Sequence, residues 1–493
     1  MSFVSDIDKP SNVHVEDIER GEKASVQELD PEHHDYLMKR HGTVDLDPLP
    51  SSDPLDPLNW PDWKKNFQIL LIALQTFSAT FMAAGLTPAF QPMAEVYGIS
   101  VPKASYFTSA QIAAFGVMPL LWVPLMNYYG RNPFLITSSL LCACLNIAGG
   151  FCKTFAQQMA TRVLVGIFIS TAFAAGASFV ADLAFSHERG KKNGWWSLAL
   201  VVGTPGGPFV CGFVQQHAGT KWVYFVFAIL NFVQFILWLF ADETVYFRHG
   251  PQPEQKGFFR FLGLKKNPGK PLALNVFWRP FKLVTNFNVC MAVIAASIAF
   301  CYANIVLVVE LPQAMGILFE LDAQQLSYQY IALIIGSVIG ELLAGHLSDW
   351  WMKRCIAKRG GQRVIVDRLW ISYNGFVCIV VGLIVWGVYL YKAEPGHWKI
   401  SPLIGGAVAA AGNNIIATVL VAFAIDSAAD KAPDVGLYLN FVRSIYGFLG
   451  PFYFPKMFDN LNFAGSAGLM SALVVVFGAG PMILVHIRGS RRA

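Results

Sequence analysis

The sequence of 493 residues is poor in charge. Only 14% of the residues are Asp, Glu, Lys or Arg, against about 25% in soluble domains. Hydrophobic residues make up 54% of the chain and the mean hydropathy is +0.45, which excludes an ordinary soluble domain. The first 60 residues also lack an apolar run behind a positive start, so we expect no cleavable signal peptide, and the first spanning helix should itself direct insertion.

Motifs of energy-coupled enzymes are absent as well. The chain has no Gly-x-x-x-x-Gly-Lys-Ser/Thr loop, which argues against ATP-driven transport. The apolar segments contain neither a paired nucleophile and base nor a set of metal ligands, so we do not expect an enzyme. Seven of the eight cysteines lie in apolar runs, where they are expected to remain free thiols. No cofactor, bound metal or nucleic-acid partner is therefore predicted.

Long apolar segments fill most of the chain instead. About 20 apolar residues are needed to cross the roughly 30 Å hydrocarbon core of a bilayer. Twelve such segments are present, at 67–88, 107–127, 133–153, 157–182, 194–216, 221–241, 287–310, 326–348, 368–391, 402–425, 434–457 and 464–487. The predicted organisation has five parts: an acidic, disordered cytoplasmic tail (1–63), a six-helix bundle (64–241), a basic linker (242–286), a second six-helix bundle (287–487) and a basic end (488–493).

Basic residues distribute unevenly across these twelve segments. With a cytoplasmic N-terminus, 29 of the 37 Lys and Arg residues fall on the cytoplasmic side and six on the opposite side. Cytoplasmic loops of membrane proteins carry an excess of Lys and Arg. We therefore predict an integral membrane protein with both termini in the cytoplasm. The plasma membrane is the expected location, with an internal membrane such as the vacuole as the alternative.

The two sets of six segments also repeat one another. The loop at 123–132, with Gly130 and Arg131, has a counterpart at 345–354, and the loop at 182–190 has a looser counterpart at 426–436. Parallel repeats of this kind enclose a substrate site between two halves in several transporter folds. The repeat therefore predicts a carrier with a central site.

Four short motifs give the chain a specific resemblance. They are Asp56-Pro-Leu-Asn-Trp60, His187-Glu-Arg-Gly190, Asp242-Glu-Thr-Val-Tyr246 and Leu439-Asn-Phe-Val-Arg443. From about Asp56 onward the sequence resembles the major facilitator superfamily, in the fungal type of twelve-spanner drug:proton antiporter. The resemblance implies an all-α membrane protein whose twelve helices form two pseudo-symmetric six-helix bundles. It also implies a monomer in the lipid bilayer that exports a small amphiphilic drug or secondary metabolite by alternating access, with the proton gradient as its energy source.

The fifth apolar segment contains the strongest single motif. Small residues recur along one helical face, followed by a proline and a further glycine: Ala199, Gly203, Gly207, Pro208 and Gly212. Small residues at this spacing allow close helix approach in lipid, and Pro208 removes a backbone hydrogen bond and bends the helix. The pattern resembles the family's antiporter motif, although Cys211 stands where a second glycine is usual. Ordinary tight helix packing remains the alternative.

Charged residues inside the apolar segments are candidates for proton coupling. A charge at the centre of a spanning helix costs about 2.5–3.5 kcal/mol on insertion scales, so it should face a partner or a wet cavity. Arg162, with Gly166 four residues later, resembles a family motif linked to proton transfer. Glu341 and Arg443 are predicted at similar depths and are a candidate ion pair, with Glu341 as the preferred proton carrier of the second half. Asp182 completes this set, and a structural role for Arg162 stays open.

Loop residues are candidates for conformational gating. They are Gly130, Arg131, Glu188, Arg189, Gly345, Asp349 and Arg354. The family resemblance implies that a loop carboxylate caps a neighbouring helix N-terminus, where the helix dipole favours an anion. In the first half Asn127 replaces the expected Asp, and Tyr128 and Asn132 replace basic residues. This departure puts the gating role of the first loop in doubt.

Polar or aromatic residues near mid-depth are the candidate substrate contacts. They are Gln75, Tyr302, Asn304, Asn413, Asn414 and Tyr446. Each is equally compatible with a hydrogen bond between helices. Two other functions remain open: a proton symporter that takes up a small nutrient or an organic cation, served by Glu310, Glu341 and Asp426, and a non-transporting membrane receptor or sensor on the same fold.

Overall fold

The computed structural model describes residues 30–246, 275–361 and 364–490, and within these ranges the regular structure is entirely helical. Eleven described helices are long and apolar enough to cross a membrane. The last of them, Ala429–Ser490, has 62 residues, which is about three times the length needed to span a bilayer. Its backbone leaves the helical region at Asn462, with φ 52° and ψ 178°, so it comprises two spanning helices. The prediction of twelve spans is confirmed.

The first half contains spans one to six. Its helices are α3 (Asp62–Ala84), α6 (Tyr106–Tyr129), α7 (Asn132–Gly149), α8 (Phe155–Ile169) continued by α9 (Thr171–Leu183), α10 (Ser186–Ala218) and α11 (Thr220–Leu239). Between the first two spans lie η2 (Thr87–Ala89), α4 (Phe90–Tyr97) and α5 (Val101–Ala104). Turns are short: a single residue, Gly219 at φ +82°, separates the fifth and sixth spans. Glycine suits this position because left-handed φ values strain other residues.

The second half repeats this order with more irregular helices. It contains α14 (Phe287–Phe300), η4 (Cys301–Ile305), α15 (Val306–Val309), η5 (Pro312–Gly316), α16 (Ala323–Lys358), α17 (Leu369–Tyr391), α18 (Ser401–Asp426), α19 (Ala432–Leu473), η8 (Val474–Ala479) and α20 (Gly480–Ser490). The segments η4, η5 and η8 are π-helical. Short helices α13 (Asn275–Trp278), η3 (Pro280–Thr285), η6 (Ile365–Arg368) and η7 (Ala429–Lys431) lead into spans. Asp322 starts α16 through a capping box with Gln325, which satisfies free N–H groups of the first turn.

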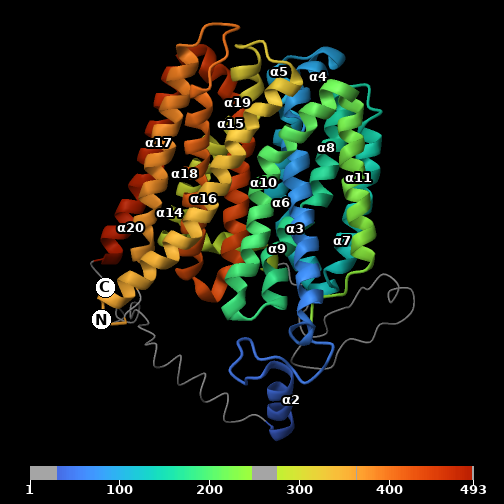
Figure 1. Ribbon diagram of the computed structural model, residues 1–493, viewed down its shortest axis with the longest axis vertical. Coiled ribbons are helices and arrows are strands. Elements are labelled where there is room, and N and C mark those ends of the chain that lie inside the picture. The colour runs from blue at the N-terminus through green and yellow to red at the C-terminus, as the bar shows by residue number, and fades with distance from the viewer. Residues whose placement is uncertain (1–29, 247–274, 362–363, 491–493) are drawn as a thin grey trace, which may run out of the picture.

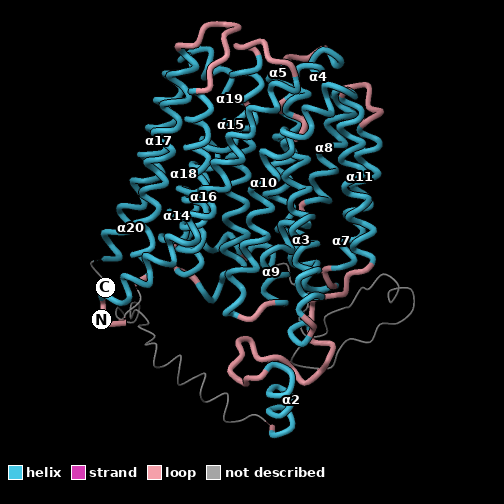
Figure 2. Tube along the Cα trace, in the orientation of Figure 1, coloured by secondary structure: helices cyan, strands magenta, loops and turns pink. Residues whose placement is uncertain are grey.

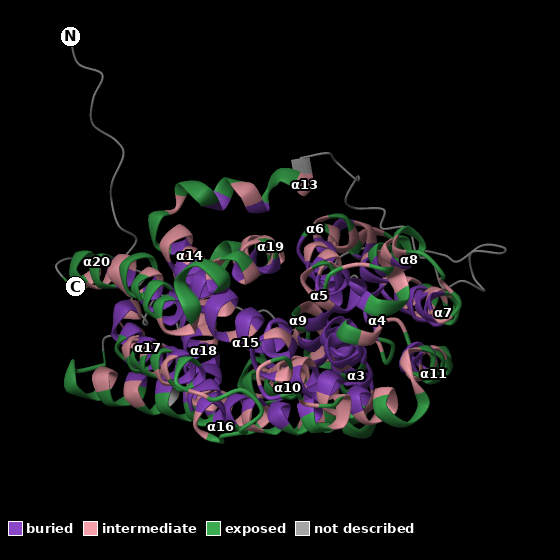
Figure 3. Cartoon of the chain, turned by 90° about the horizontal axis from the view of Figure 1, so that it is seen from above, coloured by how far each residue is buried: buried purple, intermediate pink, exposed green. Residues whose placement is uncertain are grey.

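The helices run side by side as two bundles (Figures 1 and 2). The view along them shows α3, α7, α8 and α11 on one side and α14, α17, α18 and α20 on the other, with buried residues inside both groups (Figure 3). The halves meet along two helix pairs, α10 with α16 and α6 with α19. We name the two ends of the molecule the α2 end, which is lowest in Figure 1, and the α4 end, which is uppermost.

Residues 30–63 fold at the α2 end, in contrast to the predicted disordered tail. They form α2 (Pro31–His41) and η1 (Pro57–Asn59). Arg40 donates to the carbonyl of Asn59 at 2.7 Å, and the Asn59 amide donates to the carbonyl of Ser51 at 2.7 Å. Composition alone suggested disorder because the segment is acidic, but local hydrogen bonds and the fully buried Leu58 hold it on the bundle. Residues 1–29 and the linker residues 247–274 lie outside the described ranges.

Candidate functional site

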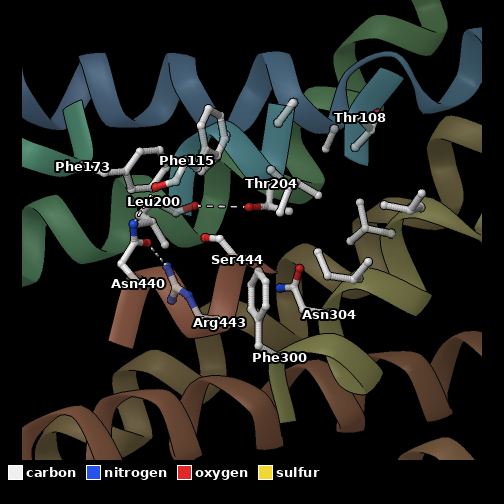
Figure 4. A pocket seen from close by; sticks show the side chains of 17 residues that line it. Thr108, Phe115, Phe173, Leu200, Thr204, Phe300, Asn304, Asn440, Arg443 and Ser444 are labelled. Atoms are coloured by element: carbon white, nitrogen blue, oxygen red, sulfur yellow. Dashed lines mark hydrogen bonds between the residues drawn. The ribbon is translucent and has the colours of Figure 1, made fainter. Parts of the chain in front are cut away.

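A small cavity lies at the junction of the two halves (Figure 4). Its volume is about 60 Å³, whereas pockets that hold drug-sized ligands measure roughly 300–1,000 Å³. In this conformation the central cavity is therefore too small to hold a drug-sized ligand. First-half lining residues are Thr80, Ala83, Ala84, Thr108, Ile112, Phe115, Phe173, Leu200 and Thr204. Second-half lining residues are Phe300, Asn304, Ile305, Val308, Val309, Asn440, Arg443 and Ser444.

Arg443 is the one charged residue among the cavity-lining residues. Its guanidinium lies 4.8 Å from the centre of the Phe300 ring and donates to Asn440 Oδ1 at 3.3 Å. Its Nε is buried without a hydrogen-bond partner among the described residues, as is Oδ1 of Asn304. Asn440 in turn donates across the junction to the carbonyl of Phe115 at 2.6 Å. Figure 4 shows these groups around the cavity.

The cavity wall combines apolar surface with a few hydrogen-bonding groups. Such a surface binds ligands mainly by apolar burial, while sparse polar groups fix their orientation. The buried guanidinium favours a carboxylate or another electron-rich group and opposes a cation, because charge interactions strengthen in a low-dielectric site. The arrangement is suited to reversible binding of a neutral or anionic amphiphile.

The glycines predicted in the fifth span lie at two close helix contacts. A Cβ on Gly203 would lie 2.1 Å from Thr80 Oγ1, and one on Gly207 would lie 2.3 Å from the Phe81 carbonyl of α3. Gly212 faces the other half, where an added Cβ would lie 1.5 Å from Ser327 Oγ of α16. Ser327 donates to the carbonyl of Pro208 at 2.9 Å. The motif therefore joins spans one, five and eight at distances that only glycine permits.

Arg162 lies inside the first bundle and does not line the central cavity. Its side chain is 1% exposed. It donates to Asn146 Oδ1 at 3.2 Å and lies 4.5 Å and 5.5 Å from the centres of the Tyr224 and Phe227 rings. Aromatic faces attract a buried cation, so this environment compensates part of the cost of burying its charge.

Glu341 has partners other than the predicted Arg443. It accepts from Ser197 Oγ of the first half at 2.6 Å and from Thr418 Oγ1 at 3.0 Å. Among the residues that the structure describes, no salt bridge joins Glu341 to Arg443, so the suggested ion pair is wrong for this conformation. Similar depth along two helices did not reveal that their side chains point toward different neighbours.

Arg131 and Asp182, assigned to different roles from the sequence, form one ion pair. It ties the start of α7 to the end of α9 at the α2 end. The second half repeats the contact between Arg368 and Asp426, at 3.7 Å. Sequence reasoning missed Arg368, although the repeat of the Asp182 loop at Asp426 was a signal for it.

The remaining loop candidates also lie at the α2 end. Glu188 pairs with Lys192 one turn later, at 2.6 Å, and Arg189 lies in the first turn of the same helix, α10. In the second half Gly345 and Asp349 lie in α16, the side chain of Asp349 being outside the described part of the structure. The Arg354 guanidinium lies 5.3 Å from the centre of the Trp350 ring.

A carboxylate that the loop analysis did not select occupies a helix N-terminus. Glu243 Oε2 accepts from the backbone N–H of Asn132, at the start of α7, at 3.0 Å. The Asn132 amide also donates to the carbonyl of Ala241 at 2.7 Å. Asn127, which replaces the expected carboxylate, is exposed. In this half the helix terminus is therefore satisfied from the segment that follows span six.

Of the six predicted substrate contacts, only Asn304 lines the cavity. Gln75 is engaged within the first bundle, where it accepts from Trp238 Nε1 at 2.6 Å and from Ser139 Oγ at 3.0 Å. Tyr302, Asn413, Asn414 and Tyr446 pack within the second half, away from the cavity lining. Sequence reasoning missed the polar lining residues Thr80, Thr108, Thr204, Asn440 and Ser444, and only Asn440 lay in a motif that could have drawn attention to it.

A second hollow, of about 650 Å³, opens at the α4 end. Both halves line it. Its first-half wall includes Thr87 and Glu95, and its second-half wall includes Pro312, Glu320 and Asp322. The halves touch below it, where the Thr87 and Tyr330 hydroxyls are 2.8 Å apart.

Two helix bundles that enclose a cavity at their junction define a polytopic membrane carrier. The chain belongs to the Major Facilitator Superfamily, whose family model matches residues 72–451. Its members are carriers of small molecules that typically act as monomers, without enzymatic chemistry, and the protein is an integral membrane transporter of this family.

Curated relatives are fungal transporters of low sequence identity. An MFS transporter of Aspergillus oryzae, cpaT, is 27% identical, with 89% of this chain and 91% of the relative covered. The efflux pump vrtL of Penicillium aethiopicum is 25% identical, with 90% and 89% covered. The xylose transporter XylE of E. coli, solved in a partially occluded inward-open conformation, matches with a TM-score of 0.61 at 15% identity and covers 84% of this chain and 97% of its own. This last similarity confirms the fold.

Proposed function

We propose that the protein is a proton-coupled exporter of a small amphiphilic molecule and works by alternating access of its two halves. The observation that carries the proposal is the central cavity, where apolar walls from both halves surround the single cation Arg443. Two relatives named efflux pumps support the direction of transport. The glycine contacts that join spans one, five and eight support antiport.

The cavity wall also narrows the cargo class. No acidic residue is among its lining residues, and a buried guanidinium opposes a cationic ligand. We therefore propose a neutral or anionic amphiphile, such as a drug or secondary metabolite with a carboxylate or phenolic group. The same guanidinium disfavours uptake of an organic cation by symport. Of the carboxylates that could serve such a cargo, Asp426 pairs with Arg368, Glu341 is hydrogen-bonded to two hydroxyls, and Glu310 does not line the cavity.

Orientation and location complete the proposal. The excess of basic residues on the α2 side supports a cytoplasmic position for that end and for both termini. The α4 end then faces outward, in the plasma membrane. Protons move inward down their gradient as the cargo moves out.

The test compares cells that lack the protein with cells that overproduce it. We expect overproducing cells to retain less of one or more labelled neutral or anionic amphiphiles, and a proton uncoupler should abolish the difference. Arg443→Gln should reduce export of an anionic cargo about tenfold, while Arg359→Gln, which changes an arginine paired with Asp367 outside the cavity lining, should leave export unchanged. Unchanged retention of a broad panel in both strains would refute export. Greater accumulation of a cation in overproducing cells would favour uptake by symport.

A further inference from the structure

Glu310 is a fully buried carboxylate in the seventh span. It directly follows α15, is 0% exposed, and neither of its carboxylate oxygens has a hydrogen-bond partner among the described residues. A buried carboxylate is normally paired or hydrogen-bonded, because desolvation of an unpaired charge is costly. The structure therefore holds Glu310 in surroundings that disfavour its charged form.

The position of Glu310 separates the two hollows. Val308 and Val309, immediately before it, line the central cavity, whereas Pro312, two residues after it, lines the hollow at the α4 end. At the same level the Tyr330 hydroxyl donates to the carbonyl of Val308 at 2.9 Å and lies 2.8 Å from the Thr87 hydroxyl of the first half. We call the region between the two hollows, formed by the Thr87–Tyr330 contact and by Glu310, the outer wall.

Among the described residues, no cation on the elements around the outer wall is hydrogen-bonded to the Glu310 carboxylate. Titratable and charged side chains on these elements include Glu95 on α4, His217 on α10, Tyr302 on η4, Glu320 and Asp322 before α16, Tyr328 and Tyr330 on α16, and Arg443, Tyr446, Tyr453 and Lys456 on α19. The carboxylates of Glu95, Glu320 and Asp322 lie on the hollow and would repel a negative Glu310. His217 is hydrogen-bonded to Gln324 at 3.1 Å, and Arg443 is bonded to Asn440 in the cavity.

We propose that Glu310 is a proton-binding site and that its protonation permits the outer wall to close. When the wall is open, the carboxylate faces the hollow and takes up one proton to become a neutral carboxyl group. The neutral group can then be buried as the structure shows. Loss of the proton into the central cavity leaves an unpaired charge that destabilises the closed wall and returns the carrier to its outward-open form.

The irregular helix geometry of the seventh span also fits this assignment. The π-helical segments η4 and η5 flank Glu310 on both sides, and such irregular turns are frequent at functional sites. The inference rests on the proposed proton coupling, and it adds the residue that carries the proton and the wall that responds to it. It also moves the preferred carrier in the second half from Glu341, which is satisfied by two hydroxyls, to Glu310.

The distance across the hollow tests the proposal in the purified full-length chain without cargo. Spin labels would be attached through introduced non-natural amino acids at Val96 and Ile317, which are 72% and 60% exposed on opposite halves. Over about pH 5 to 9, a range that spans shifted carboxylates, we expect the wild-type distances to move from short to long as pH rises. Glu310→Gln should remain short throughout, because its side chain is always neutral.

Two further variants serve as controls. Glu310→Asp retains a carboxyl group and should still respond to pH, with a shifted midpoint, so the proposal stays testable if Glu310→Gln folds poorly. Glu320→Gln removes an exposed carboxylate of the hollow and should respond as the wild type does. A wild-type distance that ignores pH, or a Glu310→Gln variant that follows the wild type, would overturn the proposal.

The outcome is separable from that of the export assay. If the distances respond to pH through Glu310 but no cargo is exported, the proton site stands and the proposed function fails. If export is proton-driven and Glu310→Gln keeps both the wild-type pH response and export, the function stands and this inference fails.

Discussion

The two halves share a framework but differ in what they bury. Each half ties the start of its third helix to the end of its fourth with an Arg–Asp ion pair, Arg131 with Asp182 and Arg368 with Asp426. The first half encloses its intramembrane cation, Arg162, against aromatic rings inside the bundle. The second half presents Arg443 to the central cavity. The repeat thus preserves the structural charges, while the charges available to a ligand lie in the second half.

Helix geometry shows the same difference. All three described π-helical segments, η4, η5 and η8, are in the second half, and two of them flank Glu310. The first half supplies regular helices and the glycine contacts of α10 with α3. We infer that the first half is the more rigid partner and that the second half contains the elements that change during transport.

The largest effects are expected from adding a methyl group at the glycine contacts of α10. One such contact lies within the first half and the other joins the two halves. Gly207→Ala places a Cβ 2.3 Å from a backbone carbonyl of α3 within the first half, and Gly212→Ala places one 1.5 Å from Ser327 of the second half. Alanine favours helices by about 1 kcal/mol over glycine, but overpacking typically costs about 1–3 kcal/mol, and contacts this short place the cost at the upper end of that range. We expect both variants to unfold at lower temperature, and Gly212→Ala also to lose transport.

Thermal unfolding in detergent and transport in cells measure these effects. Gly468→Ala is the matched control, because an added Cβ there meets nothing within 4 Å, and it should leave both unchanged or slightly raise stability. An equally stable and active Gly212→Ala variant would show that the halves do not pack as closely as the structure has them.

The two buried arginines should separate stability from transport. Arg162→Gln removes a cation from two aromatic faces, which should lower stability by about 2 kcal/mol. Arg443→Gln removes the charged group of the cavity, which should reduce transport of an anionic cargo about tenfold, the loss of roughly one charge-assisted hydrogen bond. Measuring unfolding and transport for both variants checks the distinction. If Arg162→Gln abolishes transport without lowering stability, while Arg443→Gln leaves transport intact, the prediction is wrong and Arg162 takes part in transport.

The repeated ion pairs should differ modestly in strength. The Arg131 and Asp182 side chains are 7% and 34% exposed, and those of Arg368 and Asp426 are 14% and 24% exposed at 3.7 Å. Direct contact to a more buried arginine should give the first pair a coupling energy of about 1–2 kcal/mol, and the second about 0.5–1 kcal/mol. Double-mutant cycles with alanine in each half, read by unfolding in urea, measure both. A stronger second pair would reverse the proposed difference in rigidity.

The smallest effect concerns a contact without a described counterpart in the second half. The Tyr246 hydroxyl donates to Asp53 Oδ2 at 2.8 Å and thereby links the segment after α11 to residues 30–63. Burial raises the pKa of Tyr246 above its usual value near 10. The folded form therefore holds the phenol proton more tightly than the unfolded form does. The stability from this contact is complete below about pH 10 and is lost as pH rises through the folded pKa.

Digestion of residues 30–63 by a protease active at alkaline pH reads out this contact. We expect cleavage to accelerate above the Tyr246 transition in the wild type, and Tyr246→Phe to be cleaved somewhat faster at neutral pH without that transition. Identical pH profiles for the two proteins would show that Tyr246 does not hold the segment.

Particular residues show how far sequence reasoning reached. The twelve spans, the two halves and the close contacts of Gly207 and Gly212 followed from local patterns of apolar and small residues. The cavity did not: Asn304 was found among six candidates, while Gln75 proved to be satisfied by Trp238 and Ser139. A polar residue at mid-depth can face a cavity or another helix, and the rotation of each helix that decides this depends on all its neighbours.

The sequence by itself determined a twelve-helix membrane carrier, because apolar length and backbone hydrogen bonding leave few structures that can cross a bilayer. Its basic residues also predicted the orientation. Only the tertiary structure decided which charges are paired, which face the cavity and which lie unpartnered at the outer wall. The physical reason is that a charge in the membrane is governed by its contacts across helices, and residues such as Thr87 and Tyr330 meet only when separate helices pack together.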